Sequence, residues 1–336
     1  MGKKPKILVV GSFVMDQIVT TRVFPRQGQT ILAERFNKAP GGKGANQAVQ
    51  MARLGAQVTM CGKLGHDANG DEMRRTCEEA GIDTSCILYD DNAASGCSVI
   101  ILEEQPNGGT ENRILVVPGA NMTITPEDAF LKDRIAEFDL VVLQLEIPME
   151  INTIVAKYAH DKGVPVMLNP APSAPLPEEL LACLTYLSPN EHEARDLSGV
   201  AIGHEGSHVD EASVRAAAAK LGEKGVEKLL ITIGSAGAAL VEDGRFVLSQ
   251  FVRPRRQGHR SDRSGRFVRR RVLRGGLQRP VLRGRPALCQ PHGGPDGLPS
   301  RRDAVASHAG RGRCNHARRR ERTGGLRYGT YLESRL

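Results

Sequence analysis

The sequence predicts an α/β fold with a mainly parallel central sheet and a small antiparallel β sheet attached to its edge. Along the first 251 residues, short apolar runs alternate with helical segments, which is the pattern of right-handed βαβ units. A second group of apolar runs has no helix between its members, and two of them flank a polar turn. A length of 336 residues fits one large domain with a smaller appendage.

Each predicted parallel strand is short, apolar and followed by glycine or polar residues, as expected for strands buried on both faces. These strands cover residues 6–10, 58–62, 140–145, 164–168 and 228–233, with helices over 45–54, 151–162 and 209–224. The strands without crossover helices cover 30–33, 97–102 and 112–117, and residues 104–110 form a hairpin turn. A small sheet that projects over the ends of the parallel strands would act as a lid.

Cysteine usage and hydropathy predict a cytoplasmic protein. The seven cysteines include no CxxC pair, so we expect free thiols, and the nine histidines show no metal-ligand spacing. No apolar run reaches the ~18 residues of a membrane span. The chain runs from Met1 almost directly into its first strand, which leaves no room for a signal peptide.

The most specific motif is Gly41-Gly42-Lys43-Gly44-Ala45-Asn46, which opens the first predicted helix. Glycines let a backbone approach a ligand closely, and the free N–H groups of a helix N-terminus point back at that ligand. Lys43 and Asn46 add side-chain donors, so this corner suits an oxygen-rich polar molecule. The alternative for Lys43 is a solvated lysine. The motif is not a Walker A loop, because no Ser or Thr follows Gly-Lys.

Polar residues also follow several predicted strands, at the edge where an open α/β sheet binds ligands. They include Asp16, Glu146, Asn169, Asn190, Glu193, Thr232, Gly234, Ser235 and Gly237. Taken singly, each suits a cap or a turn, and Asn190 with Glu193 suits a capping box. The functional alternative is that Glu193 holds Mg²⁺ near transferring phosphates, and that the small-residue loop at 232–237 passes close to a nucleotide.

In their order along the chain, these segments resemble the ribokinase branch of the PfkB carbohydrate-kinase family. The resemblance covers residues 6–251 and includes Asn169-Pro170-Ala171-Pro172 beside the glycine motif. It implies a ribokinase-like three-layer sandwich with a β lid from about residues 17–40 and 95–120. It also implies ATP-dependent phosphorylation of D-ribose at its 5-hydroxyl, with Mg²⁺ and a monovalent cation such as K⁺, and a homodimer formed through the lid. A kinase for another sugar or a nucleoside, and a non-catalytic sugar- or nucleotide-binding remnant, stay open.

The resemblance also implies roles for individual residues. The sugar would be bound by Asp16, Gly42, Lys43, Gly44, Asn46 and Glu146. Asn190, Thr232, Gly234, Ser235 and Gly237 would line the ATP site, and Glu193 would serve Mg²⁺. Ribokinases usually carry asparagine where this chain has Val14, which removes a donor to the sugar and leaves the identity of the sugar open.

The composition changes abruptly at about residue 252. Residues 252–336 contain 23 Arg, no Lys and five acidic residues, whereas residues 1–251 carry a net charge of −10. Low apolar content and high charge predict that this tail is disordered. An Arg-rich tail suits phosphate contacts with nucleic acid, but this one has few aromatic residues and no regular repeat, so we do not expect a nucleic-acid partner.

The family's Gly-Ala-Gly-Asp motif is missing from this tail. Its Asp is the general base, and its glycines open a helix at the transferring phosphoryl group. The Asp falls at Arg266, so no catalytic residue is intact, and the K⁺ site is expected to be lost as well.

Permitted codons for residues 256–270, read one base later, can spell Val-Lys-Ala-Thr-Asp-Pro-Thr-Gly-Ala-Gly-Asp-Ser-Phe-Val. We therefore interpret the tail as a single-base frameshift near codons 252–256, real or a sequencing error, and expect weak or no kinase activity.

Overall fold

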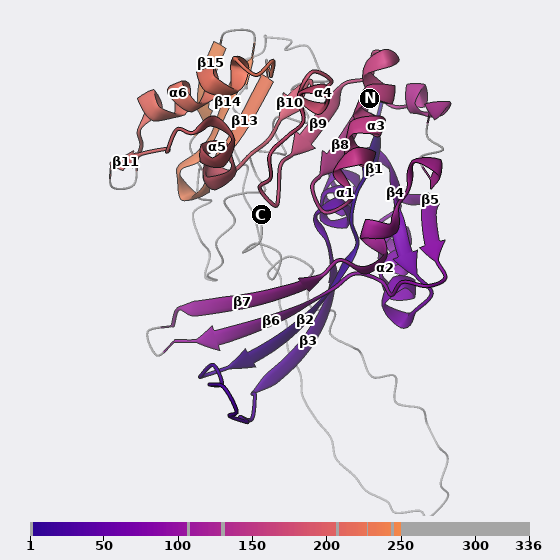
Figure 1. Ribbon diagram of the computed structural model, residues 1–336, viewed down its shortest axis with the longest axis vertical. Helices are drawn as coiled ribbons and strands as arrows, with labels where there is room; N and C mark the ends of the chain where they lie inside the picture. Colours follow the sequence, from indigo (N-terminus) through magenta and orange to yellow (C-terminus); the bar gives the residue numbers. More distant parts are fainter. Residues whose placement is uncertain are drawn as a thin grey trace, which may run out of the picture.

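The structure is a computed structural model that describes residues 3–105, 108–128, 132–205, 208–226, 228–242 and 245–249. The predicted tail, with Arg266, lies outside the described residues. Figure 1 shows a body of helices around a large sheet and a second, four-stranded sheet that projects from it. No helix among the described residues is long and apolar enough to cross a membrane.

The large sheet has nine strands in the order β15-β14-β13-β10-β9-β8-β1-β4-β5. The parallel strands are β1 (Lys6–Val10), β4 (Gln57–Gly65), β5 (Asp83–Asp90), β8 (Leu140–Gln144), β9 (Val166–Asn169), β10 (Tyr186–Leu187) and β13 (Lys228–Ile233). At one edge β14 (Gly237–Glu242) and β15 (Arg245–Ser249) continue the sheet in antiparallel fashion. The predicted mainly parallel sheet is confirmed.

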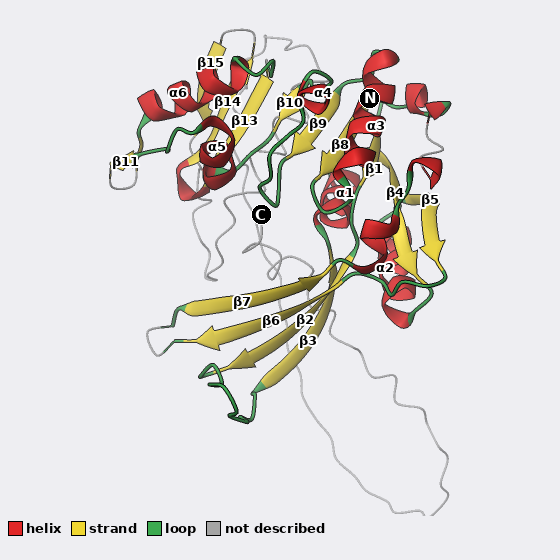
Figure 2. Cartoon of the chain, in the orientation of Figure 1, coloured by secondary structure: helices red, strands yellow, loops and turns green. Residues whose placement is uncertain are grey.

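Alternate residues of the central strands enter two separate cores. Ile7 and Val9 of β1 pack into a core with α1 (Lys43–Arg53) and α2 (Ala68–Glu79), whereas Leu8 and Val10 enter the core on the opposite face. The helices of that second core are α3 (Met149–Asp161), α4 (Glu178–Leu181), α5 (Glu191–Ser198) and α6 (Glu211–Gly222). Because helices cover both faces, the central strands β1 and β8 are almost entirely apolar, and the three-layer sandwich is confirmed (Figure 2).

The second sheet has four strands in the order β3-β2-β6-β7. They are β2 (Val14–Thr21), β3 (Arg35–Gly41), β6 (Cys97–Glu104) and β7 (Thr110–Val117). The predicted hairpin is confirmed as β6 and β7, but β2 and β6 run parallel, so the sheet is mixed rather than purely antiparallel.

The predicted strand at 30–33 is wrong. Residues 30–33 have no regular structure, and Leu32 is 96% exposed. Pairing with β2 sets the register of β3, with Thr20 opposite Arg35, and β2 ends at Thr21. Residues 30–33 therefore lie beyond the last residue of β2 that could pair with them.

The remaining described elements are short. A two-stranded sheet joins β11 (His204–Glu205) to β12 (His208–Val209), and the chain leaves β7 through the 3-10 helix η1 (Gly119–Thr123). The prediction of free thiols is confirmed for the cysteines that the structure describes. Cys289 and Cys314 lie outside the described residues.

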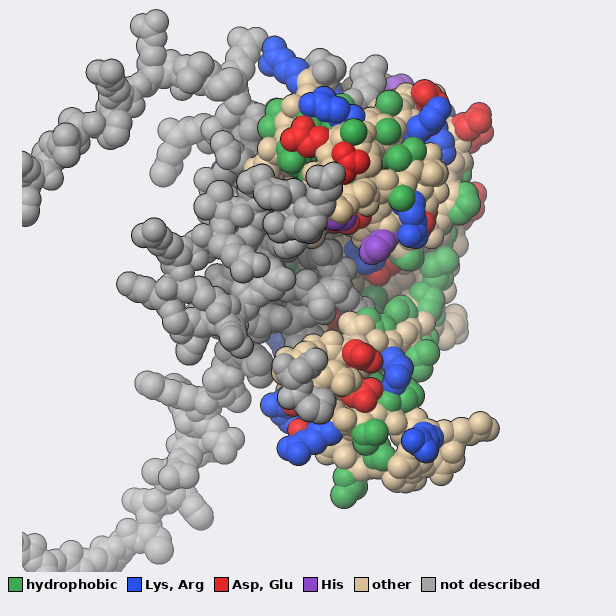
Figure 3. Space-filling model, turned by 90° about the vertical axis from the view of Figure 1, so that its left-hand side faces the viewer, with side chains coloured by type: hydrophobic (Ala, Val, Ile, Leu, Met, Phe, Trp, Pro, Cys, Tyr) green, Lys and Arg blue, Asp and Glu red, His purple; other side chains and the backbone are tan. Residues whose placement is uncertain are grey.

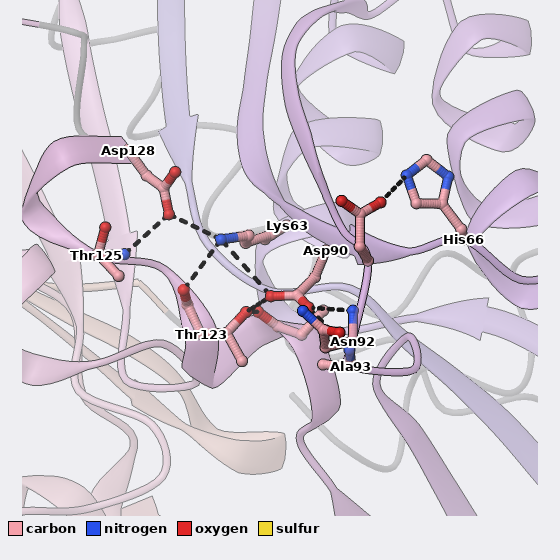
Figure 4. A network of polar contacts seen from close by, with 10 residues as sticks. Lys63, His66, Asp90, Asn92, Ala93, Thr123, Thr125 and Asp128 are labelled. Carbon is pink, nitrogen blue, oxygen red and sulfur yellow. Dashed lines mark hydrogen bonds and ion pairs between the residues drawn. The ribbon is translucent and has the colours of Figure 1, made fainter.

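A network of charged groups joins the large sheet to the chain that returns from the small sheet (Figure 4). The Lys63 ammonium of β4 makes an ion pair with Asp128 (Nζ–Oδ2 2.9 Å) and a longer one with Asp90 (Nζ–Oδ2 3.7 Å). It also donates to the carbonyl oxygen of Thr123 at 3.1 Å. Lys63 thus ties the end of β5 to η1 and to the segment that follows it.

Asp90 is held in this network by hydrogen bonds that favour its ionised form. The Thr123 hydroxyl donates to Oδ2 at 2.6 Å, and the backbone N–H groups of Asn92 and Ala93 donate to Oδ1 at 2.8 Å. The Thr123 hydroxyl is the largest cause, followed by these two N–H groups, and Lys63 adds a smaller attraction. Together they lower the pKa of Asp90 from 3.8 to about 2.

We expect Asp90→Asn to remove a pH-dependent part of the stability. A lowered pKa stabilises the folded chain in full above the unfolded value near 3.8, and this stabilisation is lost as the pH falls through the folded value of about 2. The melting temperature of Asp90→Asn should therefore lie below that of the unaltered chain at pH 6, and the two should converge towards pH 2. Asp133→Asn, at an exposed carboxylate outside this network, is the control and should show no such convergence. A constant difference from pH 6 to pH 2 would contradict the assignment.

Candidate functional site

The glycine motif at residues 41–46, which we call the glycine corner, is shaped by close backbone approach at three places. Gly42 is the N-cap of α1 with φ 94°, and a Cβ there would lie 2.8 Å from the Ser12 carbonyl oxygen and 2.8 Å from the Val14 nitrogen. A Cβ on Gly44 would lie 2.5 Å from the Ser12 nitrogen. Only glycine fits these positions, so the start of α1 packs directly on the backbone that follows β1. The helix begins at Lys43, two residues before the predicted start.

The Glu146 carboxylate sits at this helix N-terminus. Its Oε2 accepts hydrogen bonds from the Ser12 hydroxyl at 2.6 Å and from the Lys43 backbone N–H at 2.8 Å. The Lys43 ammonium lies 4.0 Å from Oε1, and the side chain is 19% exposed, so Lys43 is not a solvated surface lysine. A carboxylate is well placed at the positive end of a helix dipole. Glu146, which follows β8, is thereby joined to the corner.

Asp16 is buried in β2, where it does not simply follow the first strand as predicted. It is 3% exposed and accepts a hydrogen bond from the Ser98 hydroxyl, which stands opposite it on β6. A Cβ on Gly41 would lie 2.8 Å from Asp16 Oδ2, so this carboxylate lies against the glycine corner. Ser98 has no sequence signal, because its role depends on the pairing of two distant strands.

The predicted sugar residues are thus brought together. Asp16, Gly42, Lys43, Gly44 and Glu146 are joined by contacts around the start of α1, and Asn46 lies on the same helix turn. The Asn46 side chain is half-buried, and no described residue hydrogen-bonds to it. The cluster therefore presents carboxylate acceptors beside ammonium and amide donors, which suits a polyhydroxyl ligand.

Asn190 and Glu193 form the predicted capping box of α5. The Glu193 N–H donates to Asn190 Oδ1 at 2.8 Å, and Glu193 accepts from the Asn190 backbone N–H at 2.8 Å and from its side-chain Nδ2 at 2.9 Å. Among the described residues, no group of three or more His, Cys, Asp and Glu could hold a metal ion. A metal ion at this position would therefore have at most two such ligands among the described residues.

The loop between β13 and β14 lies beside this cap. Thr232 forms a bridge with Asn190, and its N–H donates to the Pro189 carbonyl at 2.9 Å. Gly234 and Gly237 have φ values of 41° and 112°, which favour glycine. The Ser235 side chain lies outside what the structure describes.

Sequence reasoning overlooked a carboxylate near this loop. Glu191 Oε1 lies 3.6 Å from the point where a Cβ on Gly234 would stand. Glu191 also pairs with His204 of β11 at 2.8 Å. Glu191 belonged to the motif around Asn190, but its approach to Gly234 depends on the packing of α5 beside β13.

Both halves of the site lie at one edge of the sheet. β8, β9, β10 and β13 are parallel neighbours, so their carboxyl ends share that edge. Asp16, the glycine corner and Glu146 are the residues expected to bind the sugar, and we call them the sugar half. Asn190, Glu193 and the 232–237 loop are the residues expected to bind the nucleotide, and we call them the nucleotide half. The residue at which a general base was predicted, Arg266, is outside the described residues. The described residues are therefore arranged for binding at a strand-end site.

We expect Gly42→Ala to destabilise the chain more than Gly55→Ala. Both glycines have almost the same φ, 94° and 95°, but an added Cβ on Gly55 meets nothing within 4 Å. The positive φ alone should cost about 1–2 kcal/mol at either position. At Gly42 the contacts with Ser12 and Val14 backbone atoms should add about 1–3 kcal/mol, as for an overpacked site. Urea unfolding would measure both losses, and equal losses would show that the close approach is unimportant.

Comparison with known proteins identifies the family. Residues 4–257 match the family described as "pfkB family carbohydrate kinase". A ribokinase of Bacillus subtilis is 44% identical over 189 residues, which span 56% of this chain and 63% of that protein. A deoxyribokinase of Salmonella typhi is 36% identical over 237 residues, which span 69% of this chain and 73% of that protein.

The fold agrees with this assignment. The structure of Arabidopsis thaliana ribokinase complexed with ribose and ATP superposes with a TM-score of 0.67 and 32% sequence identity, covering 76% of this chain and 80% of that one. The family match spans most of the chain and includes both halves of the site. This chain therefore belongs to the pfkB family of carbohydrate kinases.

Proposed function

We propose that this chain binds D-ribose and ATP, and that its ancestral reaction is transfer of the γ-phosphoryl group of ATP to the ribose 5-hydroxyl. The observation that carries the proposal is the sugar half, where the carboxylates of Asp16 and Glu146 meet the N-terminus of α1. Ribokinases of Bacillus subtilis and Arabidopsis thaliana, the second complexed with ribose and ATP, support the assignment.

Each half of the site has a defined task. Asp16 Oδ2 and Glu146 Oε1 would accept hydrogen bonds from sugar hydroxyls, while Lys43 and Asn46 would donate to them. Ordering the sugar in this way brings its hydroxyl close to the phosphate and supplies part of the rate enhancement. The loop at 232–237 would run along the nucleotide, because its glycines allow close approach of the backbone.

Glu193 fits the expected Mg²⁺ by its donor chemistry. Mg²⁺ keeps several waters and usually takes only one or two protein carboxylates together with substrate phosphates. Glu193 is a buried carboxylate at the helix N-terminus, where it accepts hydrogen bonds from the backbone and side chain of Asn190. When bound, Mg²⁺ would neutralise part of the phosphate charge. The K⁺ site that the resemblance implies draws on the C-terminal region outside the described residues.

We further propose that phosphoryl transfer is impaired in this chain by a single-base frameshift. The family match stops at residue 257, shortly after the composition changes at about residue 252 and before Arg266. Loss of the general base alone should lower the rate by about 10²–10⁴-fold. Loss of the helix N-terminus that stabilises the transferring phosphoryl group would lower it further. The sugar half is built from residues before this change and should still bind.

A 2-deoxypentose is the second candidate substrate, and Val14 favours it. Val14 lies two residues before Asp16, so both side chains project from the same face of β2. Val14 is 2% exposed, but it belongs to neither of the two main cores. It offers methyl groups where an amide would hydrogen-bond a sugar hydroxyl. The related Salmonella typhi protein is a deoxyribokinase.

Calorimetric titration of the chain with ribose and with 2-deoxyribose tests both candidates. We expect saturable binding of ribose, and Val14→Asn should tighten it about fivefold relative to 2-deoxyribose, because one hydrogen bond contributes about 1 kcal/mol. Val19→Asn, on the opposite face of β2, is the control and should leave the ratio unchanged. Binding of neither sugar would contradict the proposed function. A marked preference for 2-deoxyribose in the unaltered chain would replace ribose as the substrate.

We also propose a homodimer formed through the small sheet. β7 is an edge strand whose residues are all exposed, including Leu115, Val116 and Val117. Hydrophobic side chains reach the surface in the lower half of Figure 3, where Figure 1 places this sheet. An exposed apolar edge strand readily pairs with another strand. Light scattering should give a dimer mass that Leu115→Lys converts to a monomer mass, and a monomeric unaltered chain would contradict this.

A further inference from the structure

A line of buried amide groups crosses the floor of the site. Gln144 Nε2 donates to Gln47 Oε1 at 2.8 Å, and Gln47 Nε2 donates to Asn169 Oδ1 at 3.3 Å. Asn169 Nδ2 then donates to the Ser188 carbonyl oxygen at 2.7 Å. Every donor points in the same direction along this line. We call Gln144, Gln47 and Asn169 the amide relay.

The amide relay connects elements that are far apart in the sequence. Gln144 ends β8, Gln47 lies in α1, Asn169 ends β9, and Ser188 follows β10. Its first members adjoin the sugar half, since Gln47 follows Asn46 and Gln144 precedes Glu146 by two residues. Its last acceptor, Ser188, precedes Asn190 of the nucleotide half by two residues. The relay is thus a hydrogen-bonded path between chain segments that adjoin the two halves.

These side chains are buried where apolar groups would ordinarily pack. Gln144, Gln47 and Asn169 are 0%, 7% and 4% exposed. Asn152 of α3 donates to the Gln144 backbone carbonyl at 3.0 Å and holds the head of the relay from the other face of the sheet. A buried hydrogen-bonded network favours one arrangement of its members, because a displaced group loses a partner that water cannot replace.

Packing against glycine backbone also holds Gln144, the first residue of the amide relay, in place. Gln144 Oε1 is buried and has no hydrogen-bond partner among the described residues. It lies against Gly11, where an added Cβ would stand only 1.9 Å away, and beside the backbone of Gly44. The relay therefore abuts the same close approach that forms the glycine corner, so a shift of α1 must move Gln47 and Gln144 together.

We propose that Gln144, Gln47 and Asn169 are positioning residues that couple the sugar half to the nucleotide half. This inference rests on the proposed function. A sugar bound at the start of α1 fixes that helix, and the relay passes this constraint through Asn169 to the segment before Asn190. Sugar binding thereby orders the cap and the 232–237 loop for the nucleotide. The relay residues themselves touch neither ligand.

Linked titrations of the full chain test this proposal. ADP is titrated with and without saturating ribose, and the ratio of its two dissociation constants is the coupling factor. We expect a factor of about five or more in the unaltered chain, and the same factor when ribose is titrated with and without ADP. In Gln47→Met, which removes two links of the relay but keeps the side-chain length, the factor should fall below about two. Each ligand should still bind alone.

Controls separate positioning from general stability. Thr59→Val removes a buried hydroxyl that bonds Asp83 outside the relay, so it should lower the melting temperature and leave the coupling factor unchanged. Gln144→Met, which removes only the first link, should also lower the factor and serves if Gln47→Met does not fold.

The outcomes separate this inference from the proposed function. Relay variants that keep the full coupling factor, or independent binding of ribose and ADP by the unaltered chain, would overturn the relay and leave the proposed function intact. If neither ribose nor ADP binds to the unaltered chain, the proposed function fails, and the relay proposal fails with it.

Discussion

The close approach of the chain after β1 to the start of α1 is the constraint on which the site depends. Gly42 and Gly44 bring the helix onto the backbone of Ser12, and Gly11 makes room for Gln144. Because the helix starts there, its first N–H group, that of Lys43, donates to Glu146, and its second turn carries Gln47 to the amide relay. A side chain at Gly11, Gly42 or Gly44 would push α1 and Gln144 away from the backbone that follows β1. The contacts of Glu146 and of the amide relay would then be lost.

The residues that we propose for ligand binding belong to the described part of the chain, whereas the expected base does not. The residues proposed to bind the sugar lie in β2, in α1 and just after β8, all before residue 252. Phosphoryl transfer depends on a base and on a helix N-terminus aimed at the transferring group. In the family these come from the region where this chain becomes Arg-rich. Binding and turnover are therefore expected to separate in this protein.

The features that the sequence predicted are those determined by burial or by residues close together in the sequence. The central strands of the large sheet are buried on both faces, so they are recognisable as apolar runs, and the capping box is set by neighbouring residues. The glycine corner is recognisable from its run of glycines, although its shape depends on contacts with Ser12 and Val14. Contacts made by distant pairing could not be predicted. Asp16 lies within β2 because β2 pairs with β3 and β6, and that register also places Ser98 beside it and leaves residues 30–33 unpaired. The relay joins three elements through glutamine and asparagine side chains, which carry no periodic signal.

The most direct measurement is ribose-dependent formation of ADP from ATP by two purified proteins. One is the chain as given, and the other is encoded by the same DNA read one base later after codon 251. The account predicts that both bind ribose with similar affinity, and that the second turns over at least about 10²-fold faster because its base and phosphoryl-binding helix are restored. Equal turnover by the two proteins would contradict it.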